Sequence, residues 1–176
     1  MSEVLNAMKL RRSIRNYKPD MIPQETIDRI IEAGLYAASG MNRQETIIVA
    51  VTDKGVRDAL SKTNASIMGG GMDPFYGAPV VLIVLAKKDC FTGVYDGSLV
   101  MGNLMLAAHE LGVGSCWIHR AKETFEQPEW KKWLKSLGVE GEYEGIGHCI
   151  LGYTDVELSK DSPRKSGRVF YVKERR

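Results

Sequence analysis

The chain is short of several features that would assign its class at once. Its 176 residues include only three cysteines, Cys90, Cys116 and Cys149, and their odd number and wide spacing argue against a disulfide framework. The longest apolar run, residues 78–86, is far too short to span a membrane. The amino terminus has no basic segment followed by an apolar one, so no signal peptide is expected. These absences predict a reduced, cytoplasmic protein.

The charge balance and the glycine motifs argue against further classes. The formal net charge is only +2, so no bulk attraction to nucleic acid is expected. Gly112-Val113-Gly114 begins like a dinucleotide-binding fingerprint, but it lacks the third glycine and follows a helical pattern. A P-loop is absent too. Any bound phosphate is therefore expected to be held by side chains, mainly arginine.

Two local clusters of basic residues stand out against this balanced background. The amino-terminal block, residues 11–15, contains Arg11, Arg12, Ser13 and Arg15. The carboxy-terminal basic segment, residues 163–168, contains Arg164 and Lys165. Such clusters are more often solvated surface than binding sites when judged by charge alone. A fold that brought the two together would hold a phosphorylated ligand, because arginine forks match phosphate oxygens.

Hydrophobic periodicity divides the chain into alternating helices and strands. Helices are expected over residues 3–11, 27–38, 53–62, 96–111 and 128–137, and strands over residues 46–51, 79–85, 115–119, 147–153 and 169–172. Residues 63–77, with three consecutive glycines, are expected to form an irregular, mobile loop.

Three of these elements predict where the core lies. Strand 79–85 is apolar on both faces and should be central. Strand 46–51 is β-branched and also expected to be buried. Helix 96–111 is apolar around most of its circumference, which predicts burial on all sides or packing on a second subunit. We expect one α+β domain over residues 1–176, with a central, mostly antiparallel sheet flanked by helices on both faces.

No pair of side chains suited to proton transfer stands out. Cys116, His119, His148 and Cys149 could hold zinc only if they converged. Cysteines in predicted buried strands behave as small hydrophobic residues, so no metal site is expected. This absence of catalytic machinery fits a protein whose chemistry is carried by a cofactor.

The isolated histidine and tryptophan side chains have structural interpretations as well. His109 is interpreted as a buried or interface residue, and Trp130 and Trp133 as core or lid packing. Trp117 lies in a glycine-flanked strand whose backbone could approach a flat ligand.

Four blocks, in this order, resemble the nitroreductase family of FMN-dependent, NAD(P)H-using oxidoreductases. They are residues 11–15, residues 38–44, residues 103–117, and the Leu-Gly-Tyr of residues 151–153 with the later Arg164-Lys165. The sequence departs from the family pattern at Ala38 and at Glu45-Thr46, where the family often has proline and Pro-Trp. The chain also lacks the extra helical segments of larger members.

The resemblance implies a homodimer with FMN at the subunit interface, where flavin N5 carries the chemistry and no side chain is catalytic. The implied cofactor-binding residues are Arg11, Arg12, Ser13, Arg15, Ser39, Met41, Asn42, Ser115, Trp117, Ile118, Arg164 and Lys165. Ser39, Met41 and Asn42 would come from the partner subunit. Strand 115–119 would lie beside the ring with a backbone N–H near N5. Asn64 is a further candidate for contact with the flavin.

The function implied by the resemblance is a ping-pong reductase. NAD(P)H would reduce FMN, and a small oxidised acceptor such as a nitroaromatic or a quinone would then take the electrons. Two alternatives keep the fold: a flavin-binding protein without turnover, and a relative that uses reduced FMN for dehalogenation or ring cleavage. The alternative outside the family is an unrelated α+β domain that binds a phosphorylated metabolite or RNA through its basic ends.

Overall fold

The computed structural model describes residues 2–157 and 162–172. A four-stranded sheet with the order β1-β2-β4-β3 forms its centre. The strands are β1 (Thr46–Val51), β2 (Val80–Lys87), β3 (Gly114–Ile118) and β4 (Tyr143–Gly152). All three neighbouring pairs are antiparallel. The predicted α+β class with an antiparallel central sheet is therefore confirmed.

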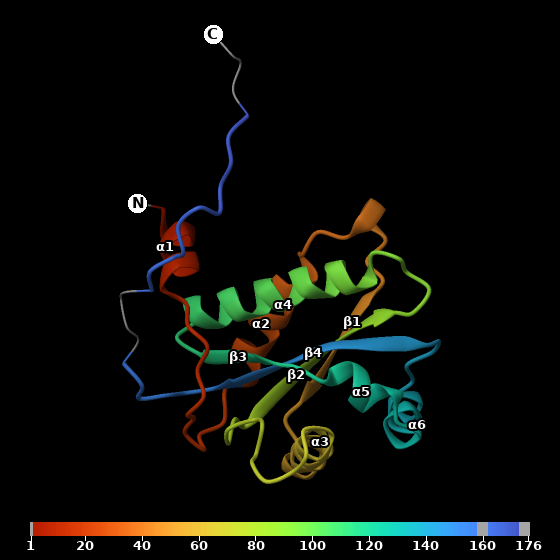
Figure 1. Ribbon diagram of the computed structural model, residues 1–176. Coiled ribbons are helices and arrows are strands. Elements are labelled where there is room, and N and C mark those ends of the chain that lie inside the picture. The colour runs from red at the N-terminus through yellow and green to blue at the C-terminus, as the bar shows by residue number, and fades with distance from the viewer. Residues whose placement is uncertain (1, 158–161, 173–176) are drawn as a thin grey trace.

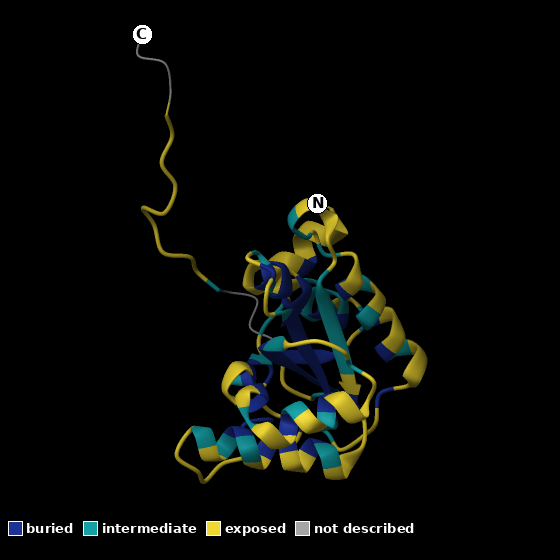
Figure 2. Cartoon of the chain, turned by 90° about the vertical axis from the view of Figure 1, so that its right-hand side faces the viewer, coloured by how far each residue is buried: buried dark blue, intermediate teal, exposed yellow. Residues whose placement is uncertain are grey.

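Helices cover both faces of the sheet (Figure 1). On one face lie α1 (Glu3–Leu10), α2 (Gln24–Leu35) and α4 (Gly93–Glu110). On the other lie α3 (Lys54–Ile67), α5 (Ala121–Glu126) and α6 (Pro128–Ser136). A short 3₁₀ helix, η1 (Gly40–Asn42), precedes β1. Figure 2 shows buried residues concentrated between these layers.

The central strand β2 explains why residues 79–85 are apolar at every position. Val80, Leu82 and Val84 belong to the core under α2 and α4. Val81, Ile83 and Leu85 belong to the core under α3, α5 and α6. Because side chains alternate between the two faces of a strand, a strand covered on both faces needs apolar residues throughout.

Several sequence predictions about single elements were wrong in detail. β1 lies at an edge of the sheet, and of its residues only Val51 is buried, so the prediction of a buried strand fails. Helix α3 continues to Ile67 and takes up the first part of the expected loop. Helix α4 starts at Gly93, and within one chain it leaves Tyr95 and Leu99 exposed, so of the two expectations for this helix only packing on a second subunit stays a prediction.

The expected strand at residues 169–172 does not form. This segment is exposed and has no strand assignment. β-branched and aromatic residues favour a strand only when a neighbouring strand is present to pair with. Figure 1 shows residues 162–172 leaving the body of the molecule. Among the described residues, no helix is long and apolar enough to cross a membrane.

Candidate active site

The amino-terminal block runs alongside the outer edge of β3. The backbone N–H of Ile14 donates a hydrogen bond of 2.9 Å to the carbonyl of Ser115, and Ser13 forms an isolated parallel bridge with Ser115. Ile14 is only 4% exposed, and its carbonyl accepts a 2.8 Å bond from the hydroxyl of Tyr17. The block is therefore fixed to the sheet by Ile14, with basic residues on either side of this anchor.

A cavity of about 210 Å³ opens between this block and the end of α4. Arg11, Arg12 and Ser115, all predicted from the sequence, contribute to its lining. His109, from the last turn of α4, and Thr154, just beyond β4, line it as well. Sequence reasoning left His109 as a buried or interface residue and did not consider Thr154. Only their neighbourhood in the fold identifies them.

The two adjacent arginines have different hydrogen-bonding roles. Arg12 braces the local chain, because its Nη1 donates to the carbonyl of Lys9 at 2.7 Å and to that of Arg11 at 2.9 Å. Nη1 of Arg11 is buried and has no hydrogen-bond partner among the described residues. A buried charged donor without an acceptor is costly. A phosphate or carboxylate in the cavity would supply the missing acceptor, so the residues present fit an anionic ligand.

The polar loop at residues 39–44 has a strained backbone. Met41, Asn42 and Gln44 all adopt left-handed conformations, with φ of 54°, 53° and 55°. Ser39 holds the loop together, because its Oγ accepts a 3.1 Å bond from the Gln44 N–H. Three such residues within four positions are unusual outside functional sites. The loop therefore combines a strained backbone with exposed side chains at residues 41–44.

This loop and the arginine cavity lie at opposite ends of α4 (Figure 1). The N–H of Gly40 donates a 3.1 Å bond to Oδ1 of Asp96 in the first turn of α4, whereas His109 is in the last turn. His109 follows Asp96 by thirteen positions along the helix, which corresponds to about 20 Å along the axis. Within one chain, Ser39, Met41 and Asn42 are therefore not brought to Arg11 and Arg12.

The outer edge of β3 beyond Ser115 has backbone groups available to a ligand. The Ser115 carbonyl points away from β4, toward Ile14. Because backbone groups alternate along a strand, those of Trp117 also point outward. The N–H of His119, just after the strand, has no backbone partner among the described residues. These groups are suited to binding the polar edge of a planar ring.

Side chains of β3 divide between the two cores. Ile118 is 7% exposed and packs under α3, α5 and α6. Trp117 is half-buried and packs against the core under α4. A Cβ at Gly147 would clash with the Trp117 indole, which explains why glycine occupies that position of β4. Of the predicted residues in β3, Ser115 lies at the candidate site through its backbone. Trp117 lies there through its outward backbone groups and its half-buried side chain.

Asn64 does not present its amide to an open site. It is fully buried, and its Nδ2 donates to the His119 carbonyl at 2.8 Å, while its Oδ1 accepts from Nε of Arg120 at 3.0 Å. Asn64 therefore links α3 to the segment that follows β3.

The remaining predicted residues are exposed. Ser13 and Arg15 of the amino-terminal block face outward. Arg164 and Lys165 lie in the exposed carboxy-terminal chain, where Nη1 of Arg164 donates to the carbonyl and hydroxyl of Ser162 at 3.0 and 2.6 Å. Figures 1 and 2 show this segment extending from the body of the molecule. Within one chain, the two basic ends do not enclose a common cavity.

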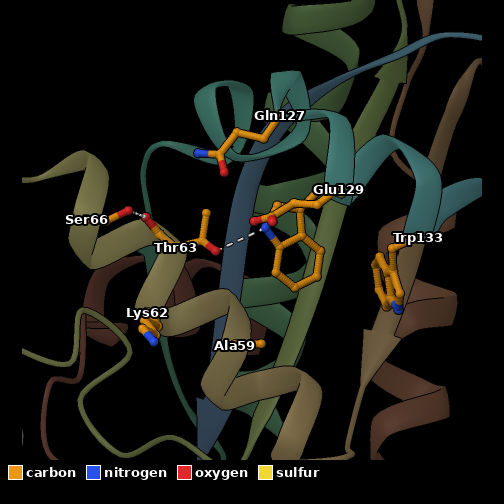
Figure 3. Close-up of a pocket in the computed structure, with 8 residues that line it drawn as sticks. Ala59, Lys62, Thr63, Ser66, Gln127, Glu129 and Trp133 are labelled. Atoms are coloured by element: carbon orange, nitrogen blue, oxygen red, sulfur yellow. Dashed lines mark hydrogen bonds between the residues drawn. The ribbon is translucent and has the colours of Figure 1, made fainter.

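A second cavity, of about 570 Å³, lies between α3 and α6 (Figure 3). Lys62, Thr63 and Ser66 line it from α3, and Trp133 lines it from α6. Nε1 of Trp130 donates a 3.1 Å bond to Thr63 Oγ1, and Trp130 is only 7% exposed. The interpretation of Trp130 as packing is confirmed.

Comparison with known proteins identifies the family. A profile of the Nitroreductase family matches residues 8–155. A relative from Archaeoglobus fulgidus, which carries the name of an NADH dehydrogenase/NAD(P)H nitroreductase, is 35% identical over 157 residues, or 87% of this chain and 86% of that one. A relative of the same name from Methanothermobacter thermautotrophicus is 36% identical over 65% of this chain, and the match spans only 60% of the relative's length.

Solved structures give the same result. A nitroreductase from Bacteroides fragilis with bound FMN matches with a TM-score of 0.89 at 30% identity, covering 98% of this chain and 100% of that one. A second FMN-bound nitroreductase, from Desulfitobacterium hafniense, shares the fold with a TM-score of 0.87 at 24% identity, over 98% and 100% of the two chains. The prediction from the four sequence blocks is confirmed, and the chain belongs to the nitroreductase family.

Proposed function

We propose that this protein is an FMN-dependent NAD(P)H oxidoreductase that reduces a small oxidised acceptor, such as a nitroaromatic or a quinone, by a ping-pong mechanism. The observation that carries the proposal is the buried Nη1 of Arg11, which lacks an acceptor beside the outer edge of β3. An FMN phosphate or ring oxygen provides such an acceptor. When bound, FMN supplies the redox chemistry by taking hydride from the nicotinamide and passing electrons to the acceptor.

The residues around the cavity would bind and orient the cofactor. Arg11 supplies a charged donor, and Arg12 holds the turn that presents it. Outward N–H groups at Trp117 and His119 are suited to the polar edge of the ring. Positive charge from the amino-terminal block would favour the anionic reduced form. Ser13 and Arg15 complete the set of expected donors on the exposed side of the block.

A homodimer would complete the site. The loop with Ser39, Met41 and Asn42 lies about 20 Å from the arginine cavity along α4, so a second copy is needed to supply it. Apolar side chains are left exposed on the three helices of that face, among them Leu5 and Met8 of α1, Tyr36 after α2, and Leu99 of α4. Exposed apolar surface of this kind is typical of a subunit interface.

The carboxy-terminal chain fits the same arrangement. Phe170 is 87% exposed and Val172 is fully exposed, which is unfavourable unless another surface covers them. We expect this tail to lie on the partner subunit, and Arg164 and Lys165 to close on the phosphate within the assembled dimer. We also propose a cytoplasmic location, because all three cysteines are unpaired thiols.

Anaerobic mixing with reduced nicotinamide tests the function. The protein is loaded with FMN, freed of excess cofactor, and mixed with NADH or NADPH under argon. Bleaching of the flavin absorbance, followed by recovery when a quinone or nitroaromatic is added, is the expected result. A flavin that stays oxidised would favour a binding protein without turnover. A protein that takes up no FMN would contradict the proposal and favour the alternative outside the family.

A further inference from the structure

Arg120 is held in a conformation that arginine rarely adopts. It follows the end of β3 by two residues and precedes α5, with φ 71° and ψ 17° in the left-handed region. Glycine takes this conformation without steric cost, whereas other residues with a Cβ are strained there. Strained residues persist where the surrounding structure fixes them, and they cluster at functional sites. This conformation makes Arg120 a candidate for a functional role.

Three contacts fix the backbone around Arg120. Its carbonyl accepts bonds from the N–H of Thr124 at 3.0 Å and from the Thr124 hydroxyl at 2.8 Å, and Thr124 is fully buried. A Cβ at Gly145 would clash with the backbone of Ala121, so β4 packs directly against the start of α5. The backbone from which the Arg120 side chain extends is therefore held in place.

The guanidinium itself is held at one nitrogen only. Nε donates a 3.0 Å bond to Oδ1 of Asn64, and Asn64 is anchored in turn through its 2.8 Å bond to the His119 carbonyl. Arg120 is half-buried. Among the described residues, its two terminal nitrogens form no hydrogen bond and no ion pair. The fork formed by these two nitrogens is thus oriented and left available, which is the geometry that binds an oxyanion through two parallel bonds.

We propose that Arg120 is a specificity-determining residue that binds an oxyanion, a carboxylate or a phosphate, on the substrate that occupies the flavin site. The inference rests on the proposed function, because it takes the edge of β3 at Trp117 and His119 as the side on which the ring lies. Arg120 directly follows this edge. The oxyanion has two possible sources: the anionic group of an acidic acceptor, or the 2′-phosphate that distinguishes NADP(H) from NAD(H).

Equilibrium binding to the oxidised, FMN-loaded protein tests the proposal without turnover. One arm titrates 4-nitrobenzoate and its neutral counterpart 4-nitrobenzamide and follows the flavin absorbance. The other arm titrates NADP⁺ and NAD⁺. Three proteins are compared: wild type, Arg120→Gln, and Arg29→Gln, in which an exposed arginine of α2 is changed. FMN content and melting temperature are measured first for each.

In wild type, one anionic ligand is expected to bind about tenfold more tightly than its less charged counterpart, which corresponds to one well-placed ionic contact. Arg120→Gln should bring that ratio close to one while leaving the affinity for the neutral ligand and for FMN unchanged, and Arg29→Gln should keep the wild-type ratio. If the affinity ratio is lost in the nitrobenzoate arm, Arg120 binds an acidic acceptor. If it is lost in the NADP⁺ arm, Arg120 binds the dinucleotide.

An affinity ratio that Arg120→Gln leaves unchanged in both arms would overturn the proposal. An equal loss of affinity for the charged and the neutral ligand would also overturn it, because such a loss indicates a structural role. If Arg120→Gln folds poorly, Arg120→Gly serves instead, since glycine tolerates the left-handed backbone, and the same loss of ratio is expected. A wild-type protein that takes up no FMN contradicts the proposed function, whereas unchanged ratios in a fully loaded protein contradict only the role of Arg120.

Discussion

The two basic segments of this chain carry the same charge in very different surroundings. Residues 11–15 and residues 163–168 each contain three cationic side chains. The amino-terminal block is anchored by buried Ile14 and by its bond to Ser115. Among the described residues, Arg164 of the carboxy-terminal segment bonds only to the nearby Ser162. This contrast fits the proposal that the chain itself builds one half of an anion site and that a partner subunit completes the other half.

Truncating one aliphatic residue in each of the two segments should give the largest difference in the free energy of unfolding. Ile14→Ala removes a buried side chain and should lower the free energy of unfolding by about 2–4 kcal/mol. Val169→Ala acts on a side chain that is 68% exposed, and should cost less than about 1 kcal/mol. Urea unfolding of the two variants checks this contrast. Equal costs would mean that the tail is as firmly packed as the block.

Acid should destabilise the sheet behind the amino-terminal block. His148 is fully buried in β4, and its ring lies 5.2 Å from that of Phe75 and 6.1 Å from that of Phe125. Burial lowers the pKa of His148 to about 4, against the effect of the nearby backbone of Ile118 and His119, and the charge of Arg120 lowers it further. The unfolded chain, with a histidine pKa near 6.5, therefore binds this proton more readily than the folded protein.

The sign of the pH effect follows from this difference. Stability from neutral His148 is complete above about pH 6.5 and is lost as the pH falls toward 4, by about 3 kcal/mol in total. Asp73, whose pKa is lowered by hydrogen bonds from Arg57 and Ser61 despite its partial burial, adds a further loss at lower pH. Unfolding free energies between pH 8 and 4 should show this decline in wild type. A His148→Gln variant with the same slope would contradict the assignment.

Truncation in the tail should affect assembly more than folding. Phe170→Ala changes a side chain that is 87% exposed in the single chain, so the fold should be unaffected. If this ring is buried on a partner, its loss should weaken dimerisation roughly tenfold or more. Analytical ultracentrifugation measures the dimer dissociation constant. Leu137→Ala, just after α6 and 52% exposed, is the control, and an equal effect of both variants would remove the tail from the interface.

Sequence reasoning succeeded where information was local. The apolar run at residues 79–85 identified the central strand, and proline at residue 128 marked the start of α6. The anchored block was identified by its residue types, because arginine and serine within five positions are a local signal.

Features that depend on distant contacts were missed. Residues 63–67, the end of α3, were expected to belong to the loop that contains three consecutive glycines, although Asn64 among them is buried in the core. The partner of Asn64 lies 55 residues away at His119, which periodicity cannot reveal. The segment around Val169 had the opposite outcome. Its residues favour a strand, but in the part of the chain that the structure describes no strand pairs with it. Local propensity decides structure only where the fold supplies a neighbour.

The affinity for FMN of matched arginine variants tests the central claim most directly. Arg11→Ala removes the donor already in place in the cavity, and it should raise the FMN dissociation constant about 100-fold, as expected for the loss of one or two charge-assisted hydrogen bonds. Arg164→Ala should raise it only about tenfold, because this residue must first be positioned by the dimer. Fluorescence titration of FMN measures both constants, with Arg29→Ala as the control. An Arg11→Ala protein that binds FMN as tightly as wild type would contradict the account.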